Sequence, residues 1–319
     1  MNELIGNTPL LAIKYKYLDQ IKTIYAKLEY YNLTGSIKDR LVYYVCSNAK
    51  KRKELKEFQP IIEATSGNTG ISLASFGAYH KHPVHIFMPN WVSKERVAII
   101  QLYGAKVYLI SKDEGGFEEC IKRAKKLCEE INGYMMNQFE NYENVKAHYE
   151  TTANEIIQQL PNIEGFISGI GTGGTFMGIA RKLKEYDQEI KTYALEPRNL
   201  PILSGGELRK SHKIYGIGDD FIPQIVEPQM IDKILQVDDD NAIRMAQKMA
   251  EELGIAVGIS SGANLYAAIQ MNQELDKVVT IIADDCKKYL STDLTKKIND
   301  KDLISNKIEL VSYEVIHVN

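Results

Sequence analysis

The sequence predicts an α/β protein of two domains, each an open, twisted and mostly parallel sheet with helices on both faces. Three observations support this fold class. Short apolar runs alternate with amphipathic stretches, two of these runs lead into glycine-rich loops, and the series divides in two near residues 141–153. Strands separated by helices pair in parallel, because each helix carries the chain back across one face of the sheet.

Hydrophobic periodicity assigns the elements of each half. In the first half we expect strands at residues 23–28, 61–62, 84–88 and 106–110, and helices at residues 39–51, 70–79, 93–103 and 117–132. In the second half we expect strands at residues 166–168, 192–195, 233–237 and 278–283, and helices from residue 175 to about 186 and at 241–253. Residues 307–318 alternate with period two, which predicts an edge strand or a dimer element.

Composition indicates a globular protein and narrows its partners. Apolar residues make up 44% of the 319 residues and charged residues 25%, and the net charge is −3. This balance gives no reason to expect a nucleic acid or an anionic membrane as a partner. No apolar run is long enough to span a bilayer or to act as a secretory signal, so a cytoplasmic protein is expected. The four cysteines lack metal-site spacing, which favours reduced thiols and no metal.

Three segments carry the chemical signal. They are Lys38 within residues 32–40 (NLTGSIKDR), the loop at residues 64–70 (ATSGNTG) and the loop at residues 169–175 (GIGTGGT). Alone, a lysine near a helix start is often a solvated charge, and a glycine-rich loop is often a tight turn. Together they supply an amine for a Schiff base, donors for small anionic groups and a phosphate cradle. That combination is typical of a pyridoxal phosphate enzyme.

The loop at residues 169–175 has the features of a phosphate site. It follows an apolar strand and opens a helix, where consecutive backbone amides carry partial positive charge. Glycine permits close approach of the backbone to an anion, and Thr172 and Thr175 add hydroxyl donors. The loop lacks the Gly-Lys-Ser/Thr ending of an ATP-binding loop. A turn that needs glycine only for packing is the structural alternative.

The other two segments suit the reacting groups. Lys38 lies just inside a helix start, with Ser36 as a candidate cap, and must be partly neutral to attack an aldehyde. Desolvation or the positive end of a helix dipole would lower its pKa. Asn68 suits a phenolate-like oxygen, while the hydroxyl-rich loop around it suits a carboxylate. An ordinary surface lysine and an Asn in a left-handed turn are the structural alternatives.

Taken together, these motifs resemble those of the cysteine synthase and cystathionine β-synthase family of pyridoxal phosphate enzymes. The resemblance runs from residues 4–10 (LIGNTPL) to residues 289–292 (YLST), most of the chain. It includes residues 27–29 (KLE), 35–40 (GSIKDR), 138–141 (QFEN), 216–218 (GIG), 221–223 (FIP) and 258–263 (GISSGA). It implies the fold-type II architecture, like that of the tryptophan synthase β subunit.

The resemblance also implies roles for individual residues. Lys38 would hold the cofactor and move the α-proton, Asn68 would bond the ring oxygen, and Gly216 would contact the substrate amine. The cofactor phosphate would be held by Gly171, Thr172, Gly173, Gly174 and Thr175. The substrate carboxylate would be bound by Thr65, Ser66, Gly67, Thr69 and Gln138.

The same resemblance implies a domain division and a partner. Residues 1–145 would form an N-terminal part that includes a mobile substrate-binding domain at about residues 39–145. Residues 146–319 would form the larger domain that binds the cofactor phosphate, with residues 1–38 packed on it. A homodimer is expected.

Three positions depart from the family pattern. Leu33-Thr34 replaces a common Pro-Gly. Asp285 stands where a serine would bond the pyridine nitrogen; a carboxylate there would hold a proton on the ring, or it turns away and the position is filled differently. Asp219 and Asp220 stand in the substrate-facing loop, where an acid would repel hydrosulfide and could act as a general base. The alternative is that one acid caps the loop and the other faces solvent.

We therefore expect β-replacement on a small amino acid through an aminoacrylate intermediate. The preferred reaction takes L-cysteine, releases hydrogen sulfide, and uses water or a thiol as nucleophile to give serine or a thioether. The alternatives are cysteine synthesis from O-acetylserine and sulfide, dehydration of serine or threonine, and a non-catalytic binding protein that kept the fold. Lys38, Asp219 and Asp220 are the expected catalytic residues.

Overall fold

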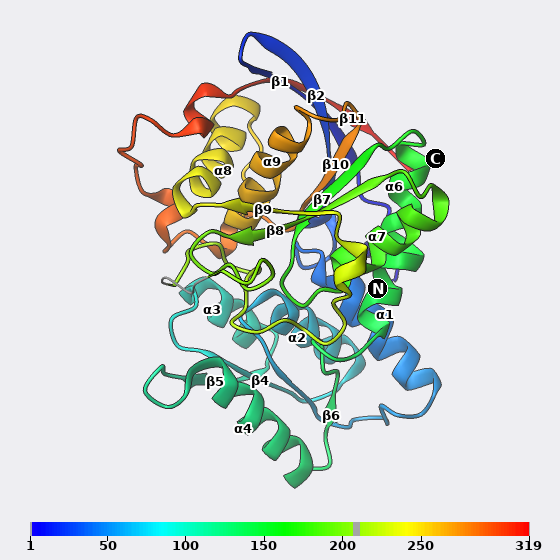
Figure 1. Ribbon diagram of the computed structural model, residues 1–319. Helices are drawn as coiled ribbons and strands as arrows, with labels where there is room; N and C mark the ends of the chain where they lie inside the picture. Colours follow the sequence, from blue (N-terminus) through cyan, green and yellow to red (C-terminus); the bar gives the residue numbers. More distant parts are fainter. Residues whose placement is uncertain (1, 207–210, 319) are drawn as a thin grey trace.

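Two sheets divide the molecule, a seven-stranded one in the upper half of Figure 1 and a four-stranded one in the lower half. The computed structural model describes residues 2–206 and 211–318. The large sheet has the order β11-β1-β2-β10-β7-β8-β9. Its strands are β1 (Leu10–Tyr17), β2 (Gln20–Leu28), β7 (Gly165–Gly169), β8 (Lys191–Pro197), β9 (Lys233–Val237), β10 (Val278–Ile282) and β11 (Glu309–Ile316).

The small sheet has the order β5-β4-β3-β6, and all its strands are parallel. They are β3 (Ile61–Ala64), β4 (Val84–Pro89), β5 (Lys106–Ile110) and β6 (Tyr134–Met135). In the large sheet β2, β10, β7, β8 and β9 run parallel, whereas β1 pairs antiparallel with both β2 and β11. The fold is therefore α/β with mostly parallel sheets, as the sequence predicts.

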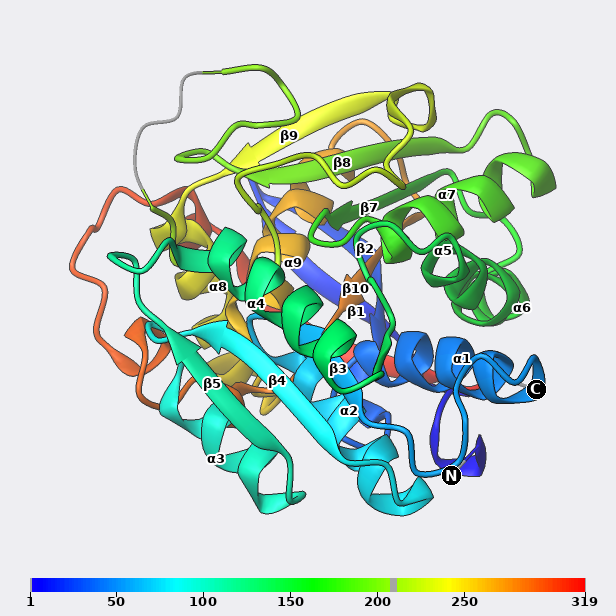
Figure 2. The ribbon, with the colours of Figure 1, turned by 90° about the horizontal axis from the view of Figure 1, so that it is seen from below.

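Helices follow most strands and cover both faces of each sheet (Figure 2). They are α1 (Lys38–Lys51), α2 (Asn68–His80), α3 (Lys94–Leu102), α4 (Gly116–Glu130), α5 (Glu143–Ala147), α6 (Ala153–Gln159), α7 (Gly174–Tyr186), α8 (Asp239–Leu253) and α9 (Ile259–Met271). Between α5 and α6 the chain forms one π-helical segment, η3 (His148–Thr152). In the large half, α8 and α9 pack into one hydrophobic cluster and α6 and α7 into another. In the small half, α1, α2 and α3 cover one face and α4 the other.

Local chemistry explains where these elements begin and end. The carboxylate of Asp238 accepts a hydrogen bond of 2.8 Å from the backbone N–H of Asn241 and so caps α8. Gly254 ends the same helix in a left-handed conformation with φ of 70°. The strand β10 has the almost entirely apolar sequence VVTII and is buried along its whole length, because it lies in the middle of the large sheet.

Most of the predicted elements are present, with four additions. The structure has two extra strands, the two-residue β6 and β1, which lies before the predicted strand at residues 23–28; that strand itself begins at Gln20. It also has α9, which the Gly258–Ala263 motif opens, and the helical run from α5 to α6 across the expected division at residues 141–153. The period-two segment at residues 307–318 forms β11, an edge strand, which confirms the first of its two readings.

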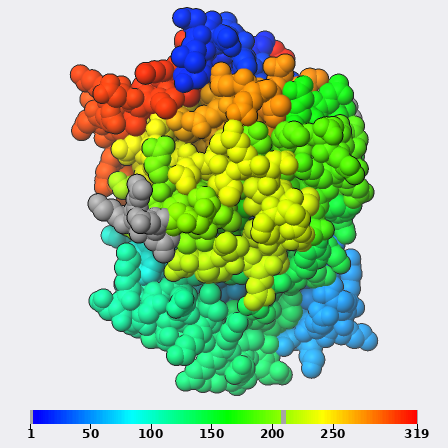
Figure 3. Space-filling model, viewed as in Figure 1, coloured from blue at the N-terminus to red at the C-terminus, as the bar shows by residue number. Residues whose placement is uncertain are grey.

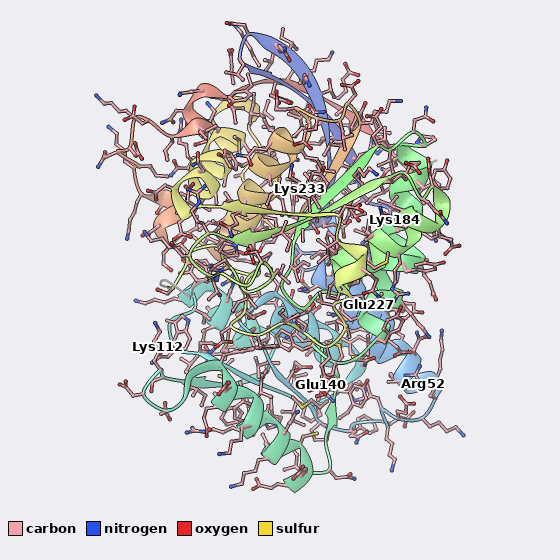
Figure 4. The ribbon with its side chains drawn as sticks, viewed as in Figure 1. Arg52, Lys112, Glu140, Lys184, Glu227 and Lys233 are labelled. Carbon is pink, nitrogen blue, oxygen red and sulfur yellow. The ribbon has the colours of Figure 1, made fainter. Side chains whose placement is uncertain are left out.

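The two halves meet along a seam that crosses the molecule. In Figure 3 the yellow-green chain of the large half and the teal chain of the small half meet along this boundary. Ion pairs also occur on the surface. The guanidinium of Arg52, which follows α1 and is labelled in Figure 4, lies 2.6 Å from the carboxylate of Glu143 in α5. Among residues 2–206 and 211–318, no helix is long and apolar enough to cross a membrane.

Candidate active site

A cavity of about 1140 Å³ opens along the seam, at the carboxyl ends of β3 and β7. Parallel sheets place the loops that follow neighbouring strands on one edge, which is where ligands bind in such folds. Both glycine-rich loops predicted from the sequence reach this cavity. Of the predicted site residues, its walls include Lys38, Thr65, Ser66, Asn68, Thr69, Gln138, Gly171, Thr172, Gly173, Thr175, Gly216, Asp219 and Asp220.

Lys38 is the first residue of α1 and faces the cavity. The preceding residues are fixed to the end of β10, because the N–H of Ile37 donates to the carbonyl of Ala283 at 2.9 Å. The hydroxyl of Ser36 accepts from the N–H of Lys38 at 3.3 Å, but the residue at the N-cap of α1 is Ile37, one position later than the cap that the sequence predicts. Burial lowers the pKa of the Lys38 amine to about 8, although Asp219 and Asp284 oppose the shift. An appreciable neutral fraction near pH 7 suits a Schiff-base amine.

A buried ionic cluster holds the start of α1 in place. The guanidinium of Arg40 donates to Glu29 at 2.6 Å and to Glu155 at 2.7 Å, and Lys27 lies 2.8 Å from Glu155. Burial would raise the pKa of Glu155, but the hydrogen bonds and charges of Arg40 and Lys27 outweigh it and hold that pKa well below its usual range. All partners are charged and hydrogen-bonded, so the cluster avoids the cost of an unpaired buried charge. It fixes the backbone two residues from Lys38.

The loop after β3 presents hydroxyls to the cavity. The hydroxyl of Thr69 donates to Gln138 Oε1 at 2.7 Å, and Gln138 Nε2 donates to the carbonyl of Ala64 at 3.0 Å. Gln138 is thereby locked beside the loop, as the predicted carboxylate site requires. Gly67 is the exception among these residues: a Cβ built on it would lie 2.3 Å from Cδ of Arg96, so Gly67 packs against that arginine.

Asn68 connects the loop to the large half. Its Nδ2 donates to Oδ2 of Asp284 at 2.7 Å, and the hydroxyl of Tyr289 donates to the same oxygen at 2.5 Å. A side-chain amide nitrogen carries two hydrogens. The bond to Asp284 therefore fixes the orientation of the amide and leaves a second hydrogen for a ligand oxygen in the cavity.

The loop after β7 forms a cradle. Gly173 has a φ of 92°, a left-handed conformation that glycine adopts without strain. A Cβ on Gly171 would lie 2.3 Å from the carbonyl oxygen of Gly216, so only glycine permits this approach of the two loops. Gly174 begins α7 behind the cradle, where a Cβ would lie 1.8 Å from Oδ1 of Asn144. Thr172 and Thr175 add hydroxyls at the start of the helix.

The acid pair splits into two environments. Asp219 is partly buried beside Lys38, whereas Asp220 is exposed at the cavity mouth. Burial, and then the neighbouring charge of Asp220, raise the pKa of the Asp219 carboxyl to about 6, while Lys38 opposes the shift. A carboxyl with a pKa near neutrality can take up and release a proton during turnover.

Asp285 lies outside the residues that line the cavity. Its Oδ1 accepts a 3.1 Å hydrogen bond from the N–H of Lys287 and lies 3.5 Å from Nζ of Lys288. This geometry matches the second reading of the sequence, in which Asp285 turns away. The neighbouring Asp284 is the buried acid of this segment, and its Oδ1 has no hydrogen-bond partner among the described residues. A contact between Asp285 and a cofactor ring nitrogen stays a prediction.

Several residues around the cavity have no individual role in the sequence-based prediction. Arg96 of α3 is buried and stacks over the rings of Tyr289 and Tyr215, with centroid distances of 4.4 and 5.2 Å, so it joins the two halves. Asn264 accepts from the N–H of Gly169 at 2.8 Å and steadies the end of β7. Ser260 lines the cavity and lies in a family motif that could have singled it out. Arg96 had no such signal, because its tyrosine partners are more than a hundred residues away.

The described residues fit pyridoxal phosphate. A neutralisable amine, an amide with a free hydrogen and a glycine cradle with two hydroxyls face one cavity. Each corresponds to a distinct part of that cofactor: its aldehyde carbon, its ring oxygen and its phosphate. No group of three or more metal-ligating side chains occurs in the part of the chain that the structure describes.

Comparison with known proteins agrees with this fit. The family model of the pyridoxal-phosphate dependent enzymes matches residues 1–284. The chain belongs to this family. A cysteine synthase of Staphylococcus aureus is 40% identical over 299 residues, which cover 92% of this chain and 96% of that protein. An O-acetylserine dependent cystathionine β-synthase of Bacillus subtilis is 39% identical, with 91% and 95% of the chains covered.

A solved structure extends the similarity to the whole chain. A hydrogen sulfide-producing enzyme from Fusobacterium nucleatum superposes with a TM-score of 0.95 at 43% identity, covering 99% of this chain and 98% of that one. The protein is thus a pyridoxal phosphate-dependent enzyme of the cysteine synthase and cystathionine β-synthase type, with a fold-type II architecture.

Proposed function

We propose that this enzyme converts L-cysteine and water to L-serine and hydrogen sulfide, and that a thiol can replace water to give a thioether. The observation that carries the proposal is Asp219, a partly buried carboxyl with a raised pKa that faces the same cavity as Lys38. Water is a weak nucleophile at neutral pH and needs a base, whereas hydrosulfide does not. A negative charge at this point would also repel hydrosulfide.

Each side chain then has a stated task. Pyridoxal phosphate supplies an electron sink that stabilises negative charge at the substrate Cα and so allows the thiol on Cβ to leave. Lys38 holds the cofactor and moves the proton at Cα. The hydroxyls of the loop at residues 65–69 and the amide of Gln138 bind the substrate carboxylate, and Gly216 faces its amine. Asp219 takes the proton from the water that attacks Cβ.

We propose that the exposed Asp220 raises the basicity of Asp219 through its charge without contacting the substrate. The two acids of the pair therefore have different proposed roles, which the sequence alone did not distinguish. The similarity to a hydrogen sulfide-producing enzyme supports the same reaction class.

Cysteine synthesis from O-acetylserine and sulfide is the second candidate. The 40% identity to a cysteine synthase favours it. Both reactions use the same cofactor chemistry and differ in leaving group and nucleophile. Only the surroundings of Cβ distinguish them, and there the aspartate pair favours the release of sulfide.

One pair of assays separates the two candidates. Purified enzyme is incubated with L-cysteine alone, and sulfide is measured together with serine, lanthionine and pyruvate. A parallel reaction contains O-acetylserine and sulfide. The proposal expects sulfide from cysteine in an amount equal to the sum of serine and lanthionine. Rapid cysteine formation from O-acetylserine without sulfide release from cysteine would contradict it. Pyruvate as the main product of L-cysteine or L-serine would indicate elimination instead.

We also propose that the small half moves as a unit toward the large one when the substrate carboxylate binds. The carboxylate loop and Gln138 belong to the small half, while the phosphate cradle belongs to the large half. A ligand that contacts both therefore stabilises the closed arrangement. Small-angle scattering with and without a bound amino acid would detect the closure.

A homodimer is the proposed assembly. The edge strand β11 leaves the apolar side chains of Val311, Tyr313 and Val315 between 41% and 48% exposed. They alternate along the strand and so share one face. A row of exposed apolar side chains on an edge strand is unfavourable in water and suits an interface with another subunit. Light scattering of the wild type and of Tyr313→Asp would test whether this strand lies in the interface.

A further inference from the structure

The segment from α5 to η3 lies directly behind the phosphate cradle and faces its two threonines. Nδ2 of Asn144 donates to Oγ1 of Thr172 at 3.0 Å and to the carbonyl of Gln138 at 2.8 Å. A carbonyl oxygen can only accept, so the second bond fixes which end of the amide faces Thr172. The hydroxyl oxygen of Thr172 is therefore an acceptor from behind, and its own proton is free to point elsewhere.

His148 stands in the same relation to the second threonine. Its ring is fully buried, with Nε2 at 3.3 Å from Oγ1 of Thr175 and Nδ1 at 3.0 Å from Oγ1 of Thr152. Burial, together with the positive charges of Lys38 and Arg40, holds the pKa of His148 well below its usual range. A neutral imidazole has one donor and one acceptor nitrogen, so it passes a hydrogen bond from one hydroxyl to the other.

Close packing makes this arrangement possible. A Cβ on Gly178 of α7 would lie 2.4 Å from the carbonyl of Val145 and 2.8 Å from Cβ of His148. Glycine at this point of α7 therefore lets the α5–η3 segment touch the helix that the cradle opens. The π-helical turn begins at His148, and such turns occur often at functional sites.

We infer that Asn144 and His148 are positioning residues that set the direction of the cradle's hydroxyl groups. Each donates a hydrogen bond to a threonine oxygen from behind, Asn144 to Thr172 and His148 through Nε2–H to Thr175. Both hydroxyl protons then face the cavity as donors for the cofactor phosphate. The inference rests on the proposed placement of that phosphate.

The physical gain is orientation without added charge. A free threonine hydroxyl rotates and presents either its proton or its lone pairs, and lone pairs repel a phosphate. A donor fixed behind the oxygen removes the unfavourable orientations before the anion arrives, which is preorganisation. A neutral histidine orients the threonine hydroxyl and adds no positive charge that would compete with Lys38 for nearby carboxylates.

Matched substitutions at His148 test the donor. His148→Gln keeps an N–H donor near the Nε2 position, whereas His148→Leu has a similar size and no donor. The dissociation constant of pyridoxal phosphate is measured by fluorescence titration of the cofactor-free protein. We expect His148→Leu to bind about tenfold more weakly and His148→Gln within about threefold of wild type. Equal weakening by both substitutions, or none by either, would overturn the inference.

A double-mutant cycle shows whether His148 acts through Thr175. Thr175→Val removes the hydroxyl, so His148→Leu should have no further effect on cofactor affinity in that background. Additive losses would overturn the inference, because His148 would then act independently of Thr175. Thermal unfolding of each cofactor-free variant confirms that the compared proteins are folded.

Nitrogen NMR reads the tautomer directly. The ¹⁵N spectrum of the cofactor-free protein is recorded between pH 6 and 8, and the signal of His148 is assigned by its loss in His148→Gln. We expect a neutral ring protonated at Nε2 throughout. A ring protonated at Nδ1, or at both nitrogens, would overturn the inference. If all variants keep the Schiff-base absorption and wild-type affinity, the inference fails and the proposed function stands. If wild type itself forms no Schiff base, the proposed function fails.

Discussion

Lys38 and Asp219 face the same cavity, but the contacts that hold them in place are very different. The residues around Lys38 are held by the buried charges of Arg40 and its partners and by a backbone bond to the end of β10. Asp219 follows Gly216 and Gly218, which have φ of 96° and 72°. That loop is held by a bond of 2.9 Å from the N–H of Gly218 to the carbonyl of Ile170 and a contact of 2.8 Å from Nε2 of His212 to the carbonyl of Gly218.

This difference in support suggests that the residues that set the reaction class lie in the rigid interior, whereas those that select the substrate lie in a loop. The chemistry common to the family depends on an amine in one fixed position, so its surroundings are built from paired charges in the interior. In the proposed reaction the nucleophile and leaving group meet a loop, which can change without disturbing the core.

Lys38→Ala should abolish the activity, with a loss of at least about a thousandfold, because we propose that the amine both holds the cofactor and moves the α-proton. The visible absorption of the Schiff base should disappear with it. Lys51→Ala, at the exposed end of the same helix, is the matched control and should retain both. Persistence of the Schiff base in Lys38→Ala would assign the cofactor to another lysine.

Asp219→Asn should slow sulfide release from L-cysteine with serine formation by about a hundredfold, the usual cost of losing a general base. Asp220→Asn, an equal change at the exposed neighbour, should stay within about threefold of wild type. Sulfide and serine are measured for both variants under saturating cysteine. The roles of the two acids would be reversed if Asp220→Asn were the slower variant.

The pH profile should carry the signature of Asp219. Its pKa is raised to about 6, and only the deprotonated carboxylate accepts a proton from water. The rate should therefore fall about tenfold for each pH unit below about 6 and level off above it. In Asp219→Asn this acid limb should vanish from the residual rate. If the rate of the variant still fell in the same way below about pH 6, that fall would belong to the titration of another group.

The smallest expected effect concerns stability. The folded pKa of Asp219, about 6, lies above the ordinary value of 3.8, so the folded state binds more protons than the unfolded state between these pH values. Stability contributed by the protonated group is thus lost as pH rises from about 4 to 6. At pH 7.5 Asp219→Asn should raise the free energy of unfolding by about 1 to 2 kcal/mol, discounted for partial exposure. Urea unfolding of cofactor-free protein at pH 7.5 and pH 4.5 would measure it, with a smaller gain at the lower pH, where only part of this stability has been lost.

Much of the fold followed from local patterns, and the omissions have physical causes. Helices such as α1 and α8 carry regular apolar spacing and were predicted within a few residues. The strand β1 combines a continuous apolar run (LLAI) with an alternation of lysine and tyrosine (KYKY), so no single strand pattern covers its length. The helix α9 was missed because it is buried on nearly all sides, which removes the amphipathic signal.

The candidate site divides in a similar way. Lys38, Asn68 and the cradle glycines lie within short motifs whose chemistry can be read from neighbouring residues. Asn144 and His148 show no such signal, because their role depends on the approach of a distant helix. The ionic partners of Arg40 could not be identified from its neighbours in the sequence, since Glu155 is 115 residues away.

The sequence by itself determined the fold class and the cofactor and singled out Lys38 as the amine that we propose to hold it, because each depends on residue types at short spacing. Only the tertiary structure decided which of two adjacent acids is partly buried beside Lys38, and that Asp284, the neighbour of Asp285, is the buried acid that bonds Asn68. Burial and pKa depend on what surrounds a side chain in space. Residues adjacent in sequence point in different directions, so a motif alone leaves that choice open.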